Sequence, residues 1–430
     1  MAVDKIDAVV VGGGLAGLSA AYRLAESGRQ VIVLERGDQP GSKNVTGGRM
    51  YLEPIRRLFP LIEQAPFERH VVKELLTVLD DEDAVQLEYM PNAWRRPPYP
   101  SYTVLRAKLD TWLSDKAMEK GAFVIPKRRV DDLLWEDGRV AGVVAGGEEI
   151  WAHIVIAADG ALSFMADKAG LRAPLAPSNY AVAVKEVYKL DEKTIEERFG
   201  LEEGQGAANL FVGAVTKGLF GGGFLYTNKD TVSLGLVVGM SSLMKSQPPV
   251  ETNTLIDAFS ARPEVACRIK GGDLKEYSAH IISEAGLAGV SKLCTGGMLV
   301  AGDAAGFALN VGITVRGMEF AIASGVLAAE TAHEALEKGD TSEALLAGYE
   351  RRLREAFVLK DMETFRYSRE VLENERLFTT YPRFICSLLG SLFTIDEKPQ
   401  TSLYQRAMGV AKEYILNWQG VKDFMTFRRI

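Results

Sequence analysis

Three glycines near the start of the chain have the spacing of a nucleotide-binding turn. Gly12, Gly14 and Gly17 form GxGxxG between an apolar strand expected over Lys5–Val11 and a helix expected over Leu15–Ser27. In such a turn the first glycine permits the tight bend, the second lets the backbone approach a pyrophosphate, and the third lets helix and strand pack closely. The helix N-terminus stabilises the negative charge of the pyrophosphate. The spacing therefore predicts a dinucleotide site.

A carboxylate stands where such a site needs one. Glu35 follows a second apolar strand, expected over Gln30–Leu34, and Arg36 comes directly after it. A carboxylate at this position can hold the two hydroxyls of a ribose. The alternative is an ordinary glycine-rich turn, and it is disfavoured because strand, helix and carboxylate all stand in the order that a βαβ nucleotide site requires.

Two later turns distinguish between a nicotinamide and a flavin. Asp159 and Gly160 end a strand expected over Trp151–Ala158, and Gly302 and Asp303 end another. An aspartate at a helix start can accept a hydrogen bond from a ribityl hydroxyl, while backbone N–H groups meet the pyrophosphate. Either turn alone could be a routine helix cap. Together with GxGxxG they resemble the FAD-containing hydroxylase and geranylgeranyl-reductase superfamily, which implies FAD as the cofactor.

The same resemblance implies roles for two further segments. Arg106, in LRAKLD, matches the R-x-x-x-D segment whose arginine reaches towards the phosphate and ribityl region of the flavin; an exposed arginine at a helix start is the alternative. Gly312, Ile313 and Thr314 resemble a loop whose amides approach the pyrimidine edge of the ring. Negative charge gathers there on reduction, and N–H donors stabilise it.

A narrower resemblance covers nearly the whole chain. The segments KNVTGGRMY (43–51), GGGFLYTNKDTVSLGLVVG (221–239), AGDAAGFALN (301–310) and NERLFTTYPRF (374–384) resemble the FixC family, flavoprotein relatives of electron-transfer-flavoprotein:quinone oxidoreductase. This resemblance places Lys43, Gly48 and Arg49 near the flavin, with the Gly48–Arg49 backbone close to the ring. The complete expected cofactor set is Gly12, Gly14, Gly17, Glu35, Arg36, Lys43, Gly48, Arg49, Arg106, Val130, Asp159, Gly160, Gly302, Asp303, Gly312, Ile313 and Thr314.

The cysteines separate this chain from the similar mitochondrial-type enzymes, which carry a four-iron cluster on C-terminal cysteines. Cys267, Cys294 and Cys386 lie far apart without metal-site spacing, and no cysteine follows Cys386. Because a cluster needs four thiolates or their equivalents, we expect no metal site in this polypeptide. In FixC-type systems a separate ferredoxin-like iron–sulfur protein fills this role, so the resemblance implies such a partner.

The resemblance also implies the reaction and the other partners. FAD would accept electrons from the α and β subunits of an electron-transfer flavoprotein and pass them to menaquinone or ubiquinone. The larger assembly would bifurcate electrons from NADH. Such transfer needs closely spaced cofactors rather than an acid–base pair, so no dedicated catalytic residue is expected. The histidines fall in no motif and are expected to be structural: His70, His153, His280 and His333.

Composition limits the location and the partners. A net charge of −7 argues against a general nucleic-acid binder. The N-terminus has no secretory signal pattern, and no window approaches the roughly 18 apolar residues of a membrane span. We expect a cytoplasmic protein, peripheral on the inner face of the cell membrane. Two apolar segments could contact the membrane or belong to the core or a subunit interface: Tyr381–Phe393, with Phe384, Ile385, Leu388, Leu389, Leu392 and Phe393, and Leu219–Tyr226.

The patterns together predict an α/β fold, an FAD-binding Rossmann-like domain of the hydroxylase and geranylgeranyl-reductase type. Residues 1–175 and 285–340 form this domain, and residues 176–284 form an inserted antiparallel β-sheet domain for quinone or substrate. Residues 341–430 are expected to be helical, with a long amphipathic run over 341–375. A hairpin is expected to turn at Asp137 and Gly138, because Asp-Gly readily takes positive φ angles.

Two other functions are compatible with this fold class. A geranylgeranyl reductase or hydroxylase would need a long substrate tunnel and, for hydroxylation, direct access for NAD(P)H. Rab escort and GDP-dissociation-inhibitor proteins share the fold as lipid-binding modules without flavin. This last alternative is disfavoured because GxGxxG, Glu35, Asp159 and Asp303 are all intact.

Overall fold

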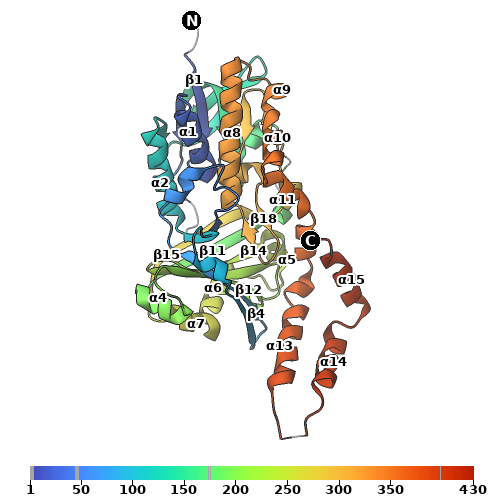
Figure 1. The fold of residues 1–430 in the computed structure, drawn as a ribbon. Coiled ribbons are helices and arrows are strands. Elements are labelled where there is room, and N and C mark those ends of the chain that lie inside the picture. The colour runs from blue at the N-terminus through green and yellow to red at the C-terminus, as the bar shows by residue number, and fades with distance from the viewer. Residues whose placement is uncertain (1–3, 44–47, 173, 175, 398) are drawn as a thin grey trace.

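Two β-sheets form the body of the protein, and a helical arm extends from it (Figure 1). The structure is a computed structural model that describes residues 4–43, 48–172, 174, 176–397 and 399–430. Residues 44–47 of the KNVTGGRMY segment and the expected domain limit at residue 175 lie outside the described residues. The fold is α/β, as the sequence predicts.

The first sheet carries the glycine turn. Its parallel strands run in the order β7-β2-β1-β10-β17, with β16 antiparallel at the edge. Their bounds are β1 (Ile6–Val11), β2 (Val31–Leu34), β7 (Phe123–Ile125), β10 (Glu148–Ala157), β16 (Cys294–Thr295) and β17 (Met298–Val300). Valine and isoleucine dominate β1 and β10, as is typical of strands covered on both faces. Because β1 lies between β2 and β10, a crevice opens beyond its carboxyl end.

Helices α1 (Leu15–Glu26), α2 (Arg106–Glu119) and α8 (Met318–Lys338) pack closely beside this sheet. The approach of α8 to α1 requires glycine, because a Cβ added to Gly325 would lie 2.1 Å from the carbonyl oxygen of Ala16. The hairpin of β8 (Val130–Glu136) and β9 (Arg139–Ala145) joins the same sheet. It turns at Asp137 and Gly138 with φ of 49° and 75°, which confirms the predicted turn.

The second sheet has nine strands and lies below the first in Figure 1. Its order is β15-β11-β14-β13-β12-β4-β6-β3, with β5 paired to β4; β12 and β4 are parallel, and the other pairs are antiparallel. The bounds are β3 (Gly48–Tyr51), β4 (His70–Leu79), β5 (Ala84–Tyr89), β6 (Ser101–Val104), β11 (Tyr180–Lys189), β12 (Gln205–Gly213), β13 (Gly221–Thr227), β14 (Thr231–Gly239) and β15 (Asp273–Ser283). Strands from 48–104 therefore share one sheet with strands from 180–283. The predicted domain limits stay predictions.

A second hydrophobic core lies on one face of this sheet, under α4 (Glu192–Phe199), α6 (Thr252–Ala261) and α7 (Pro263–Ile269). Asp191 caps α4, because its carboxylate accepts hydrogen bonds from the backbone N of Lys193 and Thr194 at 3.1 and 3.2 Å. The other face of the sheet is turned towards the glycine turn of the first sheet.

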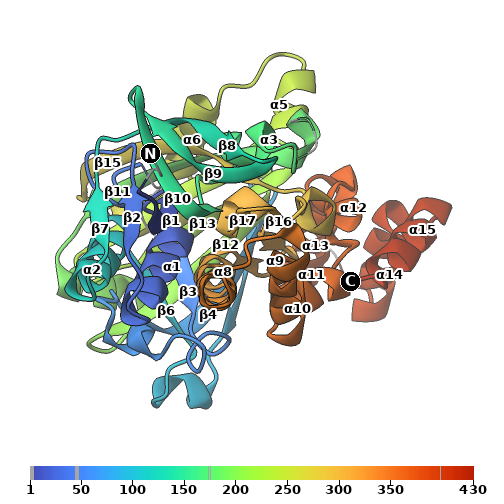
Figure 2. The ribbon, with the colours of Figure 1, turned by 90° about the horizontal axis from the view of Figure 1, so that it is seen from above.

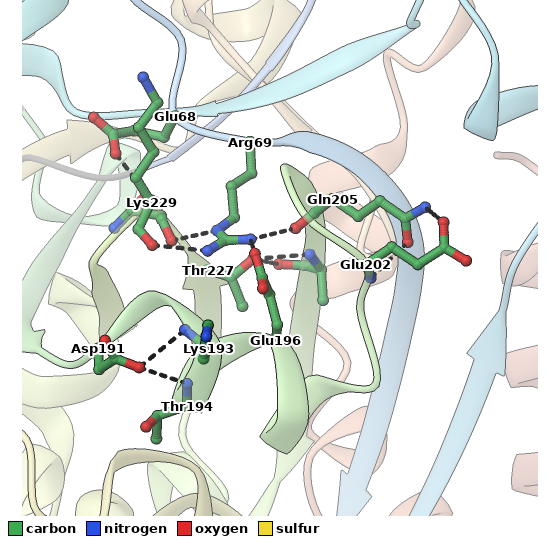
Figure 3. A network of polar contacts seen from close by, with 12 residues as sticks. Glu68, Arg69, Asp191, Lys193, Thr194, Glu196, Glu202, Gln205, Thr227 and Lys229 are labelled. Carbon is green, nitrogen blue, oxygen red and sulfur yellow. Dashed lines mark hydrogen bonds and ion pairs between the residues drawn. The ribbon is translucent and has the colours of Figure 1, made fainter.

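A buried arginine joins the strands of the second sheet where β4 and β12 begin (Figure 3). Arg69 is 2% exposed, and its guanidinium donates to the carboxylate of Glu196 on α4 at 2.9 Å. It also donates to three backbone carbonyls: Asn228 at 2.6 Å, Lys229 at 2.8 Å and Gln205 at 3.0 Å. One side chain thus links α4, the start of β12 and the turn between β13 and β14.

The amphipathic run over 341–375 is helical, as predicted, but it is divided into four short helices. These are α9 (Glu343–Leu346), α10 (Gly348–Glu355), α11 (Val358–Thr364) and α12 (Ser368–Leu372). The backbone leaves helical geometry at Ala356, with ψ −104°, and Phe357, with φ −150°. The breaks let successive segments follow the core, so that Leu353 on α10 and Val358 on α11 are both fully buried.

Helices α13 (Thr380–Phe393), α14 (Leu403–Tyr414) and α15 (Trp418–Phe427) form the arm, which lies on the opposite side of the molecule from α2 (Figures 1 and 2). Asp423 on α15 is 2% exposed and accepts hydrogen bonds from Asn374 at 2.9 Å, Arg376 at 2.7 Å and Tyr381 at 2.7 Å. These bonds fix the end of the arm to the segment that enters α13. In the described part of the chain, no helix has the length and apolar character needed to cross a membrane.

Candidate flavin and substrate site

A cavity of about 1020 Å³ lies between the carboxyl ends of the first-sheet strands and the second sheet. All but three of the predicted cofactor residues line it. They are Gly12, Gly14, Glu35, Arg36, Lys43, Gly48, Arg49, Arg106, Val130, Asp159, Gly160, Asp303, Gly312 and Ile313. Residues 300 positions apart in the sequence, Gly12 and Gly312, thus share one cavity, as a site built from separate strand ends requires.

The three other predicted residues do not line the cavity but lie next to residues that do: Gly17, Gly302 and Thr314. A Cβ on Gly17 would stand 2.0 Å from the carbonyl oxygen of Gly12, so Gly17 permits the packing of α1 on the turn. Gly302 has φ of 65° and packs against α1, where a Cβ would lie 2.7 Å from the Cβ of Ala16. Thr314 lies between two lining residues, Ile313 and Val315.

The turn after β1 presents the N-terminus of α1 to the cavity. Gly12 has φ of 106°, and a Cβ there would lie 2.3 Å from the carbonyl oxygen of Ala158, so only glycine fits. Gly14 is the N-cap and provides no side-chain hydrogen bond to the first turn. The first N–H groups of α1 consequently stay available for an anion, and the helix dipole favours one.

Two predicted carboxylates already accept hydrogen bonds from the backbone. Glu35 is 8% exposed and accepts from Gly13 N at 2.7 Å and Gly37 N at 2.5 Å, which fixes its carboxylate beside the turn. Asp159 accepts from Ser163 Oγ at 2.9 Å and Met165 N at 3.0 Å. It therefore caps α3 (Phe164–Lys168), the role considered as its alternative, while it also lines the cavity.

Asp303 differs from these two carboxylates, because no hydrogen bond reaches its carboxylate oxygens from the part of the chain that the structure describes; its backbone carbonyl accepts from Gly306 N at 3.0 Å. Burial raises the pKa of Asp303, and the charges of Arg106 and His280 oppose that rise. Arg106 forms a bidentate ion pair with Asp110, with both N–O distances 2.8 Å. Its Nη2 lies 3.8 Å from the position of a Cβ on Gly14, directly over the glycine turn.

These features fit the parts of FAD. A half-buried acceptor without a protein donor suits a sugar-alcohol hydroxyl, and a guanidinium beside an uncapped helix N-terminus suits a pyrophosphate. Burial opposes the charged form of Arg106, but Asp110 and Asp303 hold its pKa above the ordinary value. The guanidinium therefore keeps its charge beside the turn.

Lys43, Gly48 and Arg49 line the other side of the cavity. The guanidinium of Arg49 is engaged within the sheet: it pairs with Glu74, donates to Ser101 Oγ at 3.0 Å and lies 5.3 Å from the ring centroid of Trp94. The Arg49 side chain therefore has a structural role, whereas Lys43 is an exposed residue at the edge of the cavity.

The segment Leu219–Tyr226, one of the two possible membrane contacts, lies in the core instead. It contains β13, an inner strand of the second sheet, and Gly221–Gly223, Phe224 and Tyr226 line the cavity. The glycines make room for neighbours, since a Cβ on Gly223 would meet the ring of Phe259 at 2.7 Å. For this segment the structure supports a place in the core rather than membrane contact.

Sequence reasoning missed two cavity residues at the end of β15. His280, expected to be structural, lines the cavity, and so does Glu284. Burial lowers the pKa of His280; Asp303 counteracts this, while Arg36 and Arg106 add to it. The local sequence gives no sign of this placement, which depends on the pairing of β15 with β11 across about a hundred residues.

Comparison with known proteins defines the class and then the family. Residues 7–90 match the FAD dependent oxidoreductase model, and residues 369–430 match the ETF-QO/FixC family C-terminal domain. The protein is thus an FAD-dependent oxidoreductase.

It is 44% identical to the probable electron transfer flavoprotein-quinone oxidoreductase YdiS of Escherichia coli K12, over 96% of each chain. It is 45% identical to Protein FixC of Escherichia coli O157:H7, over 92% of each chain. The chain therefore belongs to the FixC family.

A solved structure agrees with the fold. The geranylgeranyl bacteriochlorophyll reductase-like protein of Thermoplasma acidophilum superimposes with a TM-score of 0.73 over 99% of each chain, at 22% sequence identity. At that identity the match supports the architecture alone.

Proposed function

We propose that this flavoprotein accepts electrons from the α and β subunits of an electron-transfer flavoprotein and passes them to menaquinone or ubiquinone. The assembly would oxidise NADH, bifurcate its electrons and include a separate ferredoxin-like subunit. Membership of the FixC family supports the proposal, as does the similarity to YdiS, a probable electron transfer flavoprotein-quinone oxidoreductase. The observation that carries it is one continuous cavity with a charged end at the glycine turn and an apolar end beyond it.

We propose that the charged end binds FAD. Glu35 would hold the adenosine ribose, the α1 N-terminus and Arg106 would hold the pyrophosphate, and Asp303 would accept from the ribityl chain. In the Gly312–Thr314 loop, Ile313 and Thr314 would supply N–H groups at the ring, since Gly312 N donates to Asn310 Oδ1. Bound FAD supplies the one- and two-electron chemistry. The protein residues bind it, orient it and keep water from it.

The apolar end suits a prenylated quinone. The residues that line it come from β13 and the position before it, from the end of α12 and from the segment before α13: Phe220, Phe224, Leu372, Leu377 and Phe378. Burial of apolar ligand surface there stabilises the bound quinone by roughly 25 cal/mol per Å². Because β13 joins this end to the Gly48–Arg49 side, a quinone ring could lie next to the flavin ring.

Reduction by a partner flavoprotein tests the proposal against the reductase and hydroxylase alternatives. We expect NADH alone to leave the yellow protein oxidised under anaerobic conditions. NADH with the partner electron-transfer flavoprotein should bleach it within seconds, and a short-chain quinone should then restore the colour. Flavin absorbance measures each step. Rapid bleaching by NADH or NADPH without the partner would overturn the proposal and favour a hydroxylase.

We further propose that the tip of the arm contacts the inner face of the cell membrane. Around the turn between α13 and α14, Phe393 and Ile395 are 80% and 81% exposed, and Leu403 and Tyr404 are 66% and 73% exposed (Figure 1). The other α13 residues considered for lipid contact are half-buried: Phe384, Ile385, Leu388, Leu389 and Leu392. The exposed tip, rather than the face of α13, is therefore the membrane candidate.

A Phe393→Asp, Tyr404→Asp double variant should bind liposomes of bacterial polar lipids about 100-fold more weakly than the wild type. Insertion of each aromatic side chain is worth roughly 1.5 kcal/mol, and 1.4 kcal/mol is tenfold in affinity. Vesicle flotation measures the change. The control is Met118→Asp on α2, which alters an exposed apolar residue on the opposite side of the molecule. Equal binding of the double variant and the control would refute the contact.

A further inference from the structure

A buried carboxyl group stands at the apolar end of the cavity. Glu284 follows β15 and is 8% exposed. Asn310 Nδ2 donates to its Oε2 at 3.2 Å, and no further hydrogen bond or ion pair reaches this carboxyl group from the described residues. Burial of a carboxyl group costs free energy unless the group is protonated or forms a hydrogen bond with a ligand bound beside it.

The neighbours of Glu284 are held in place by other partners. Asn310 Oδ1 accepts from Gly312 N at 2.9 Å, which turns the amide nitrogen of Asn310 towards Glu284. Arg369 on α12 is the charged group nearby, but its guanidinium donates to Asn179 Oδ1 at 2.7 Å and to the carbonyl of Ser178 at 3.0 Å. Arg369 therefore does not form an ion pair with Glu284.

A second, much smaller pocket lies on the other side of Glu284. It holds about 10 Å³, room for roughly one water molecule. Phe220, Glu284, Ala308, Asn310 and Leu372 line both spaces, and Gly286, Ser368 and Arg369 complete the small one. Glu284 thus stands in the wall between the main cavity and a pocket beside the partly exposed Arg369.

We propose that Glu284 is a proton donor to a carbonyl acceptor bound at the apolar end of the cavity, and that it regains its proton through the small pocket beside Arg369. This inference rests on the proposed quinone reduction. Reduction of one quinone consumes two electrons and two protons and converts two C=O groups into two C–OH groups. The electrons come from the flavin. One of the two protons also comes from the reduced flavin; Glu284 gives the other proton to the quinone oxygen beside it, becomes a carboxylate and regains its proton from solvent, so one transfer from Glu284 completes one quinol.

The electrostatics agree with this role. Burial raises the pKa of Glu284 to about 7, while the hydrogen bond from Asn310 and the charge of Arg369 oppose the rise. At neutral pH the group therefore populates both the donor form and the form that accepts the next proton, the condition for efficient acid–base work.

Infrared spectroscopy and kinetics on Glu284→Gln test the proposal. At pH 7 the wild-type holoprotein should show a C=O stretching band of a protonated carboxyl group that shifts in D2O, and Glu284→Gln should lack this band. Oxidation of the reduced flavin by a ubiquinone with one isoprene unit should slow about 100-fold in the variant. The wild-type rate should fall as pH rises through about 7, because the donor form is lost. The variant should lose that dependence.

Glu186→Gln is the matched control. Glu186 is a 6% exposed carboxyl group of the same sheet that accepts from Tyr188 Oη at 2.6 Å, a bond that glutamine can keep. This control should retain the band and the wild-type rate. Retention of the band or of the wild-type pH profile in Glu284→Gln would overturn the inference. If even the wild type failed to reduce quinone, the proposed function would fail, and the infrared band would still decide whether Glu284 carries a proton.

Discussion

An Asp303→Ala variant is expected to purify without stoichiometric flavin while keeping its fold. The carboxylate of the half-buried Asp303 lines the charged end of the cavity and accepts no hydrogen bond from the described residues. It is thus free to accept from a ligand. Hydrogen bonds to an ionised acceptor are worth about 1.5–3 kcal/mol each, so loss of one such bond with the carboxylate should weaken FAD binding by about 10- to 100-fold.

The flavin-free protein separates this effect from misfolding. Burial raises the pKa of Asp303 above its unfolded value, so at pH 7 the ionised carboxyl opposes folding rather than supporting it. Apo Asp303→Ala should therefore unfold at the same temperature as the apo wild type, or higher. Absorbance gives the ratio of flavin to protein, and titration gives the affinity. Asp257→Ala, which removes an exposed carboxylate on α6, is the control. Native flavin affinity in Asp303→Ala would remove this residue from the site.

The features that the sequence predicted correctly are those set by local chemistry. Positive φ at Gly12 and the Asp137–Gly138 turn follow from which residues tolerate that geometry. The strand ends at Asp159 and Asp303 could be placed together because parallel strands present their carboxyl ends to one crevice. Each of these predictions depends only on a few neighbouring residues and on the geometry of parallel strands.

The features that the sequence did not reveal depend on pairing between distant segments. β12 lies parallel to β4, more than a hundred residues earlier, and no short pattern encodes that partner. The apolar, glycine-rich β13 could equally have faced lipid, because hydrophobicity alone does not distinguish a cavity wall from a membrane surface. Likewise, the sequence around Glu284 does not show that the end of β15 reaches the cavity.

Arg69→Met is expected to lower the free energy of unfolding by about 3–5 kcal/mol, the usual cost of removing one partner of a buried ion pair. The substitution leaves the carboxylate of Glu196 and the carbonyls of Gln205, Asn228 and Lys229 without their donor (Figure 3). Lysine cannot replace arginine here, because one ammonium does not span acceptors on three separate segments. Arg69→Lys should therefore lose nearly as much.

Urea unfolding of the flavin-free protein, followed by tryptophan fluorescence, measures the loss without a contribution from bound FAD. Arg129→Met is the control, since Arg129 is 78% exposed and its ion pair with Asp131 is a surface contact. The control should unfold at the urea midpoint of the wild type. A midpoint for Arg69→Met equal to that of the control would contradict this prediction. It would mean that water or a shifted α4 donates to the acceptors that Arg69 leaves, and that the stability of the second sheet does not depend on this arginine.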